Sequence, residues 1–310
     1  MYYVIEKDFI YTIIYNEKIE RVFVEDPNAI EVGSILHARV KRVDKNRSFS
    51  FVEMGGVDGF YNDCDLKAGG DYLFNIRKKP EGEKGYVLDR QIKITLDNHT
   101  MYPLSSDYYD NEAEKIIGCP VRVKRPNEKT IQKLLAIKKE IDRQKSQLPI
   151  PKIVYKNPPE SQLYIDMHRE EEGTREEMER AMQNTPEIKG RHVKLDEGSL
   201  IIDTHEHFTF VDFNTDDYSK NYTRELNHLE LNKKLLAETI RILTLRNIEG
   251  MILIDLLKMK DNHELITYTR QILKTTDYNY HDITKLGIME LTRKKYGRQN
   301  SDEYMANIML

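Results

Sequence analysis

Cysteine is scarce in this chain of 310 residues, which contains only Cys64 and Cys119. Two cysteines cannot build a disulfide framework, and these two do not form the CxxC pair of a zinc site, so we expect a reducing compartment. Glycine and proline are also infrequent, at 15 and 10 residues. Their low number excludes collagen-like and proline-rich fibrous proteins.

Long hydrophobic segments are missing as well. The longest apolar run covers residues 250–257 and is interrupted by Asp255, which is far short of the roughly 20 residues that a membrane-spanning helix needs. The first ten residues lack the basic start and the apolar stretch of a signal peptide. We therefore expect a soluble, cytoplasmic protein that does not bind a membrane.

Charged residues make up 32% of the chain, yet 19 tyrosines and 9 phenylalanines can fill a core, which excludes wholesale disorder. The net charge of −4 argues mildly against a nucleic-acid-binding protein. The charge is unevenly distributed, because residues 122–145 are rich in lysine and arginine whereas residues 166–180 are acidic. A local basic patch can bind phosphate even in an acidic protein.

The first third of the chain consists of short β-branched and aromatic runs. Runs at 2–5, 10–15 and 21–25 predict strands, and several more follow between residues 33 and 96. Many short strands in a segment of that length indicate a small barrel, for which the OB type is the commonest. Apolar side chains at helical spacing then predict a helix over 127–147, and the polar stretch 160–184 predicts a solvated helix or linker.

From residue 192 onward the pattern changes to alternating strands and helices. The predicted strands cover 199–203, 208–213, 251–257 and 287–292. The predicted helices are 225–247, with Gly250 as its C-terminal stop, and a segment that opens with the capping-box-like pair Asp261 and Glu264. This order predicts parallel strands around right-handed crossovers, with 251–257 as a buried central strand.

Two of these strands carry the strongest candidate for a chemical site. Asp212 and Asn214 alternate with apolar residues, so both side chains point to the same face of a strand. Asp255 interrupts an apolar strand, where an unpaired carboxylate is costly. Two carboxylates near the carboxyl ends of neighbouring strands can hold Mg²⁺. The alternative is that each aspartate only caps a helix or ends a strand, and the pattern leaves both interpretations open.

Another motif, Asp203-Thr-His205-Glu-His207, is similar to the metal-binding Asp-x-His-x-His of amidohydrolase barrels. Such a barrel needs roughly 200 residues or more, and too few residues follow the motif here. We therefore expect an exposed hairpin turn.

In the barrel segment, Phe49 and Phe51 alternate with Ser50 and Val52, and Phe60 follows close to a turn. A phenylalanine on the outer face of an OB barrel can stack on a base, but spacing alone favours rings that fill the core. Lysines in the glycine-punctuated stretch 78–85 either bind phosphates or form a charged surface turn.

Several motifs in the last third of the chain occur in the order and at the spacing of a known family. They read GSLIIDTHEHFTFVDFNT, AETIRILTLRNIEGMILIDLLKM and LGIMELTRKK. Together with the front segments VGSILHARVKRVDKNRSFSFVEMGGVDGFY and RKKPEGEKGYVLDRQIKI, they make the chain resemble the ribonuclease E/G family, the Mg²⁺-dependent endoribonucleases of bacterial RNA processing and decay.

The resemblance implies an α+β, multidomain fold with four segments. These are the opening strands of an RNase H-like region (1–32), an inserted OB-fold RNA-binding domain (33–96), a shortened RNase H-like region with a linker (97–190), and a DNase I-like α/β catalytic domain (191–310).

The resemblance also implies roles for individual residues. Asp212 and Asp255 would be the Mg²⁺ ligands, and Asn214 would orient the scissile phosphate or the attacking water. The implied RNA-binding residues are Phe51 and Phe60 for bases, Lys78 and Lys84 for the backbone, and Arg122 for a 5′-monophosphate. For the two phenylalanines, this assignment is the reverse of what spacing alone favours.

The chain departs from the family pattern at several positions, among them His205-Glu206-His207, which stand in place of its Thr-Glu-Ala. Asp216 replaces the glycine after Asn-Thr, Glu249 replaces the second glycine before the strand of Asp255, and Val123 replaces the threonine beside Arg122. The CPxC zinc-link of many relatives is absent, so we expect neither structural zinc nor a zinc-linked tetramer, while a homodimer stays open.

The resulting prediction is an endoribonuclease that uses Mg²⁺ to cleave single-stranded RNA by phosphodiester hydrolysis, in RNA processing or decay. The departures at Asp216 and Glu249 motivate an alternative, a catalytically weak or inactive RNA-binding or regulatory protein of the same fold. A third interpretation is a phosphodiesterase for DNA or small nucleotides, although the barrel and its lysines suit a longer strand better.

Overall fold

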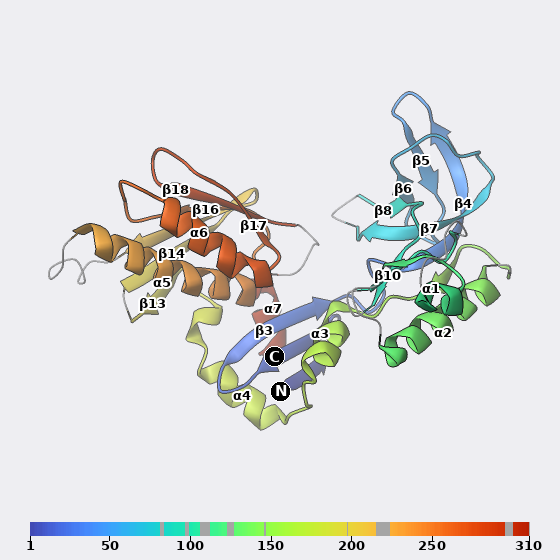
Figure 1. The fold of residues 1–310 in the computed structure, drawn as a ribbon. Helices are drawn as coiled ribbons and strands as arrows, with labels where there is room; N and C mark the ends of the chain where they lie inside the picture. The colour runs from blue at the N-terminus through green and yellow to red at the C-terminus, as the bar shows by residue number, and fades with distance from the viewer. Residues whose placement is uncertain are drawn as a thin grey trace. The chain divides into compact units, whose positions relative to one another are not determined.

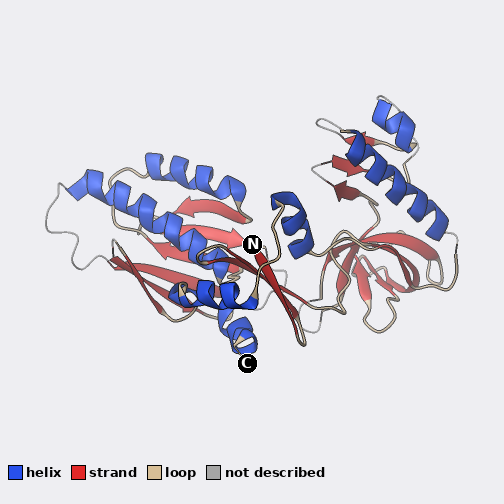
Figure 2. Cartoon of the chain, turned by 90° about the horizontal axis from the view of Figure 1, so that it is seen from below, coloured by secondary structure: helices blue, strands red, loops and turns tan. Residues whose placement is uncertain are grey.

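The structure is a computed structural model. It describes residues 1–80, 84–96, 99–105, 112–122, 127–145, 147–196, 198–214, 224–294 and 300–309. The chain divides into two compact units, Met1–Pro27 with Glu170–Leu310, and Asn28–Arg169. The marked N- and C-termini therefore belong to the same unit (Figure 2). The four predicted segment boundaries stay predictions.

The unit Asn28–Arg169 contains a closed barrel of five strands (Figure 1). The strands are β4 (Ile35–Asp44), β5 (Phe49–Val52), β6 (Gly59–Tyr61), β7 (Asp71–Lys78) and β8 (Tyr86–Asp89). They pair in the order β4-β5-β6-β8-β7, and β7 pairs again with β4, which closes the barrel. Its interior is filled by side chains no more than 3% exposed, among them Ala38, Val40, Val52, Phe74, Ile76 and Leu88. The predicted small barrel is confirmed.

Most of the other elements of this unit contribute side chains to a second apolar cluster. Its further elements are β9 (Ile94–Leu96), β10 (His99–Met101), α1 (Glu112–Ile117), β11 (Val121–Arg122), α2 (Glu128–Gln144), β12 (Lys152–Tyr155), which pairs with β4, and α3 (Glu160–His168). The helix predicted over 127–147 is confirmed as α2, which begins where the Asn127 side chain accepts a hydrogen bond from the Thr130 amide at 2.8 Å. Leu134 and Ile141 on this helix are buried.

The other unit begins with a three-stranded antiparallel sheet, β1 (Tyr2–Glu6), β2 (Ile10–Tyr15) and β3 (Ile19–Glu25). Tyr11, Ile13 and Tyr15 on one face of β2 are fully buried. They belong to one cluster with residues of α4 (Arg175–Gln183) and α7 (Ser301–Ile308). The polar stretch 160–184, predicted as one helix or a linker, is therefore two helices, α3 and α4, and α7 was not predicted.

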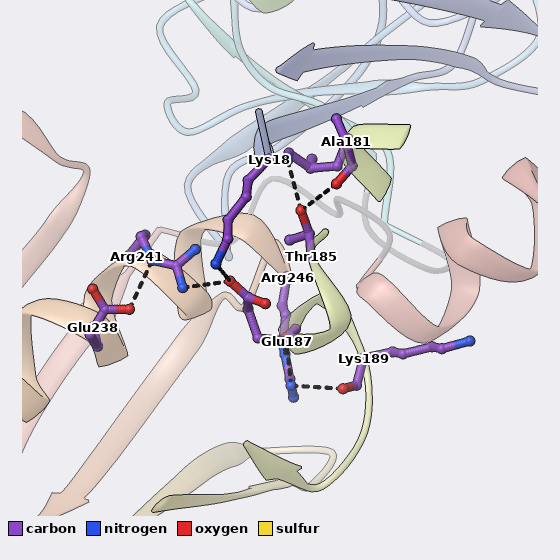
Figure 3. Close-up of polar contacts among 9 residues, drawn as sticks. Lys18, Ala181, Thr185, Glu187, Lys189, Glu238, Arg241 and Arg246 are labelled. Carbon is purple, nitrogen blue, oxygen red and sulfur yellow. Dashed lines mark hydrogen bonds and ion pairs between the residues drawn. The ribbon is translucent and has the colours of Figure 1, made fainter. Parts of the chain in front are cut away.

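Glu187 lies at the centre of a polar network that joins distant parts of this unit (Figure 3). Its Oε1 accepts a hydrogen bond from Arg241 at 2.8 Å and lies 3.7 Å from Lys18 Nζ. Arg246 donates to the Glu187 carbonyl at 2.8 Å and to the Lys189 carbonyl at 3.1 Å. Burial alone would raise the pKa of the Glu187 carboxyl, but a hydrogen bond from its own backbone amide and the nearby cations hold that pKa below its usual value. The network thus ties Glu187 and Lys189 to Arg241, on the helix of residues 224–245, and to Arg246, directly after that helix.

The larger sheet of this unit has six strands in the order β13-β14-β15-β16-β18-β17. They are β13 (His192–Leu195), β14 (Gly198–Thr204), β15 (Phe208–Asn214), β16 (Gly250–Asp255), β17 (Tyr278–Ile283) and β18 (Ile288–Arg293). The pair β15–β16 is parallel, as predicted, but β18 is antiparallel to β16. The prediction of a parallel last strand is wrong because β17 precedes β18 in a hairpin, which reverses the chain direction.

Helices α5 (Arg224–Leu245) and α6 (His263–Ile272) pack against each other over one face of this sheet (Figure 1). The core between them contains, among others, Val211, Phe213, Ile252, Ile254, Leu236, Leu243 and Leu265. β16 is central in the sheet, as predicted, but only alternate residues face this core, and Met251 is 47% exposed. The mixed α+β class, with a five-stranded barrel and further sheets and helices, is confirmed.

Two local predictions about helix ends in this unit are wrong. Helix α6 has Asn262 as its N-cap without a side-chain cap, while the Asp261 side chain accepts from the His263 amide and Glu264 pairs with Lys233. Helix α5 ends before Asn247, whose φ of 53° breaks the helix, so Gly250 starts β16 instead of stopping the helix. In the described part of the chain, no helix has both the length and the apolar character for crossing a membrane.

Candidate active site

The structure brings Asp212 and Asp255 together. β15 and β16 are parallel neighbours, and Asp212 is the register partner of Asp255. Register partners on adjacent strands point to the same face and are separated by the strand spacing of about 4.8 Å. Val211 and Phe213 on β15, and Ile254 on β16, point into the helix-covered core. Both carboxylates therefore lie on the opposite face of the sheet, where they are half-buried.

The charge of Asp212 acts on the Asp255 carboxyl. The pKa of the Asp255 carboxyl is raised, first because burial penalises the charged form and second because the negative charge of Asp212 opposes ionisation. Lys258 acts in the opposite direction. Neither aspartate makes an ion pair with another described residue, so the pair is a concentration of negative charge that a bound cation would stabilise.

The donor set fits Mg²⁺. This ion prefers oxygen ligands and is commonly held by one or two carboxylates, with water and substrate oxygens completing its shell. Among the residues that the structure describes, no group of three or more His, Cys, Asp or Glu could hold a metal ion. Two carboxylates alone suit Mg²⁺ better than Zn²⁺, which usually takes three or four protein ligands.

Asn214 is the last residue of β15, two positions after Asp212, and its half-buried side chain points to the same face. Its register partner on β14 is Ser199. The amide can donate one hydrogen bond and accept another beside the two carboxylates. Asp216, one of the departures from the family pattern, lies outside the described residues.

Sequence reasoning missed the residues that hold the segment after Asp255. The side chain of Asn232, on α5, is fully buried, donates to the Leu257 carbonyl at 2.8 Å and accepts from the Leu257 amide at 3.0 Å. The Nδ1 atom of His228 lies 2.9 Å from the Lys258 carbonyl. No periodicity signals such contacts, because they join a helix to a loop about 25 residues further along the chain.

The Asp203-Thr-His205-Glu-His207 motif forms the predicted turn. Residues 205–207 connect the antiparallel strands β14 and β15 and are exposed. Asp203 pairs with Arg191, a bond that leaves its carboxylate neutralised.

The barrel carries three phenylalanines on its outer side. The ring centroids of Phe49 and Phe51 are 5.0 Å apart, and those of Phe51 and Phe60 are 5.1 Å apart. The Arg42 guanidinium lies 4.2 Å from the centroid of Phe51. The alternate residues Ser50 and Val52 are fully buried, whereas the three rings are half-buried and do not belong to the barrel core. The interpretation that these rings fill the core is therefore wrong.

The predicted phosphate-binding residues are exposed. Lys78 ends β7, and Lys84 lies shortly before β8. Arg122 lies in β11, with its guanidinium 5.8 Å from the Tyr102 ring centroid. These residues and the pair of aspartates belong to different units of the chain. Val123 lies outside the described residues.

Comparison with known proteins identifies the same family that the sequence motifs resemble. The sequence model of the ribonuclease E/G family matches residues 129–296. Ribonuclease E of Synechocystis sp. is 33% identical over 106 residues, and ribonuclease E of Nostoc sp. is 30% identical over 106 residues. A ribonuclease E/G-like protein of Pyropia yezoensis is 29% identical over the same length. Each match covers 33% of this chain but only 16%, 15% and 21% of the respective relatives.

Proposed function

Because the chain belongs to the ribonuclease E/G family, we propose that it is an endoribonuclease that hydrolyses phosphodiester bonds of single-stranded RNA with Mg²⁺. The observation that carries this proposal is the register pairing of Asp212 with Asp255 on the face of the sheet away from its helices. Burial and the charge of Asp212 raise the pKa of the Asp255 carboxyl, so ionised Asp255 is unfavourable for the fold, and a bound divalent cation would offset this cost.

In this proposal Asp212 and Asp255 hold the cation with their carboxylate oxygens. Mg²⁺, when bound, would neutralise charge on the phosphate and lower the pKa of water. Asn214 orients the scissile phosphate or the attacking water through its amide. The contacts from Asn232 to Leu257 hold the segment that follows Asp255, so the carboxylate keeps its position when charged ligands enter the site.

We assign RNA binding to the barrel, which we interpret as an OB fold. Its closed order of five strands supports this interpretation, because oligonucleotides bind OB barrels on the face of the second and third strands. Those strands are β5 and β6, which carry Phe51 and Phe60. The two rings would stack on bases, and Lys78 and Lys84 would contact the phosphate backbone.

The remaining family features are carried over as part of the same proposal. Residues 1–32 and 97–190 would be a shortened RNase H-like region, and residues 191–310, with Asp212 and Asp255, a DNase I-like domain. Arg122 would recognise a 5′-monophosphate. The protein would act in cytoplasmic RNA processing or decay, and a homodimer stays open.

A gel assay tests the proposal. The substrate is a 5′-monophosphorylated, A/U-rich single-stranded RNA, incubated with wild-type protein in Mg²⁺ or in EDTA, and with the Asp212→Asn/Asp255→Asn double variant. We expect cleavage by the wild type in Mg²⁺ alone. Cleavage by the double variant at the wild-type rate would contradict the metal assignment.

The half-buried aromatic cluster on the outer side of the barrel, formed by Phe49, Phe51 and Phe60, favours one alternative, an RNA-binding protein with little or no turnover. The aromatic cluster lies on β5 and β6 and does not depend on the strands of Asp212 and Asp255. RNA binding would therefore survive if the aspartate site did not support cleavage. In the same assay, a salt-sensitive gel shift without cleavage in Mg²⁺ would support this alternative and would direct attention to Asp216 and Glu249.

A further inference from the structure

Two loops meet at the carboxyl end of β16, directly beside Asp255. One loop follows β16 over residues 256–262, and the other is the β17–β18 turn over residues 284–287. The Leu256 amide donates to the Gly287 carbonyl at 3.3 Å. Gly287 has a φ of 93°, a conformation that glycine adopts without strain, and its amide donates to the Thr284 carbonyl at 2.9 Å.

The first of these loops is held firmly by α5. Both backbone groups of Leu257 are bonded to the fully buried Asn232, and the Lys258 carbonyl is bonded to His228. A buried amide that satisfies both groups of one residue fixes the local backbone, because breaking the pair would leave buried polar groups unsatisfied. The position of the next residue, Lys258, is therefore well defined relative to Asp255.

The first loop carries two exposed lysines, Lys258 and Lys260, of which Lys258 is nearer to Asp255 along the chain, and the second loop carries one, Lys285. Lys258 follows Asp255 by three residues, and Lys285 precedes Ile288, the register partner of Asp255 on β18, by three residues. Neither lysine forms an ion pair with any carboxylate that the structure describes. The charge of Lys258 already acts on the Asp255 carboxyl. Two lysines that make no ion pair with a described residue thus lie in the two loops that meet beside Asp255.

We propose that Lys258 and Lys285 form a phosphate-binding pair that holds the backbone of the RNA strand at the catalytic edge of the sheet. The phosphates of an RNA strand bring negative charge to a site that already contains the carboxylates of Asp212 and Asp255. Cations beside the reacting phosphate, in addition to the proposed Mg²⁺ on it, would reduce this repulsion. Lysine suits this role, because its flexible ammonium group contacts phosphate oxygens without reading the base. The proposal rests on the proposed ribonuclease function and adds a second RNA contact to the one assigned to the barrel.

The experiment compares Lys258→Gln, Lys285→Gln and their double variant with Lys274→Gln. Lys274 is an exposed lysine four residues before Tyr278. Tyr278 is the register partner of Arg293, and Arg293 is the register partner of Gly250. Gly250 and Asp255 are the two ends of β16, so Lys274 precedes the end of the sheet that is away from Asp255. The control thus removes the same charge from the same sheet, but away from the site. Affinity for a fluorescein-labelled, A/U-rich single-stranded RNA is measured in EDTA at several salt concentrations, and cleavage is measured in Mg²⁺.

Each glutamine variant should bind about 3- to 10-fold more weakly at low salt, and its plot of log affinity against log salt should flatten by about 0.7 per lost phosphate contact. Lys258→Arg and Lys285→Arg should retain the wild-type slope, because they keep the charge. Cleavage should fall in parallel for the glutamine variants and stay unchanged for Lys274→Gln.

Two results would overturn the inference. If Lys258→Gln and Lys285→Gln match Lys274→Gln in slope and cleavage while the wild type cleaves RNA, the lysine pair is not an RNA contact, and the proposed function stands. If the wild type neither binds nor cleaves RNA, the proposed function fails and the lysine pair fails with it. If the wild type binds RNA but does not cleave it, the slopes of log affinity against log salt decide alone whether Lys258 and Lys285 contact the RNA backbone.

Discussion

Replacing Asp255 by asparagine should stabilise the metal-free protein. At a separation of about 5 Å, set by the strand spacing, two unit charges repel by about 3 kcal/mol at an effective dielectric constant of 20 and by about 0.8 kcal/mol in bulk water. Both carboxylates are half-buried, so a value near the lower limit, about 1 kcal/mol, is realistic. For a unit of this size, that corresponds to a rise in Tm of about 2–4 °C.

The direction in which this stability difference changes with pH follows from the raised pKa of the Asp255 carboxyl. The folded protein binds the proton more tightly than the unfolded chain does, so lowering the pH through the raised pKa favours the folded state. The advantage of Asp255→Asn over the wild type should therefore be greatest at neutral pH and should shrink as the pH falls through that pKa.

The assay is thermal unfolding, followed by circular dichroism, in EDTA and in Mg²⁺. Mg²⁺ should raise the Tm of the wild type, by the equivalent of about 2.7 kcal/mol at 100 times its Kd, and should have no effect on Asp255→Asn. The matched control is Asp282→Asn, because Asp282 is an exposed carboxylate of the same sheet whose Oδ1 accepts from the Ile283 amide, a bond that asparagine keeps. A wild type indifferent to Mg²⁺, together with an Asp255→Asn variant no more stable than the control, would refute the electrostatic reasoning.

Three further predictions concern other residues. Asn232→Leu leaves both backbone groups of Leu257 without a partner, so it should cost about 1–3 kcal/mol and speed amide hydrogen exchange at Leu257, measured by mass spectrometry. Phe51→Ala should weaken RNA binding by about 5- to 100-fold in fluorescence anisotropy with little change in Tm, because stacking on one ring contributes about 1–3 kcal/mol and the ring lies outside the barrel core. Burial raises the pKa of the Cys119 thiol to about 11, so at pH 8 iodoacetamide should label Cys64 well before Cys119, and equal rates in peptide mapping would contradict this.

Local patterns predicted most of the strands and the main helices, because alternation and helical spacing are properties of short segments. β2 was predicted over its full range, and α2 within a few residues at its ends. The aspartate pair was predictable for the same reason, since β15 and β16 are separated by one long helix, and a strand–helix–strand unit places its strands side by side in parallel.

The errors arise where pairing partners decide the structure. The direction of β18 depends on the unpredicted strand β17, whose polar residues hide its alternation. The outward position of Phe51 depends on which face of β5 is closed by the barrel, and both faces of that short strand carry apolar residues. Asn232 looks like an ordinary polar residue of a helix until the loop that it bonds is placed beside it.

A comparison with the ion-pair partners of other carboxylates in this unit supports a function for the aspartate pair. Asp203 is paired with Arg191, Glu187 with Arg241, and Asp277 with Arg293. Each of these acids has an arginine within bonding distance, which offsets the cost of removing it from water. Asp212 and Asp255 instead face each other from adjacent strands, and Lys258, whose charge acts on Asp255, makes no ion pair with either of them. The fold thus neutralises these three partly buried acids but leaves Asp212 and Asp255 opposed, and such a local cost is expected where a ligand supplies the missing charge.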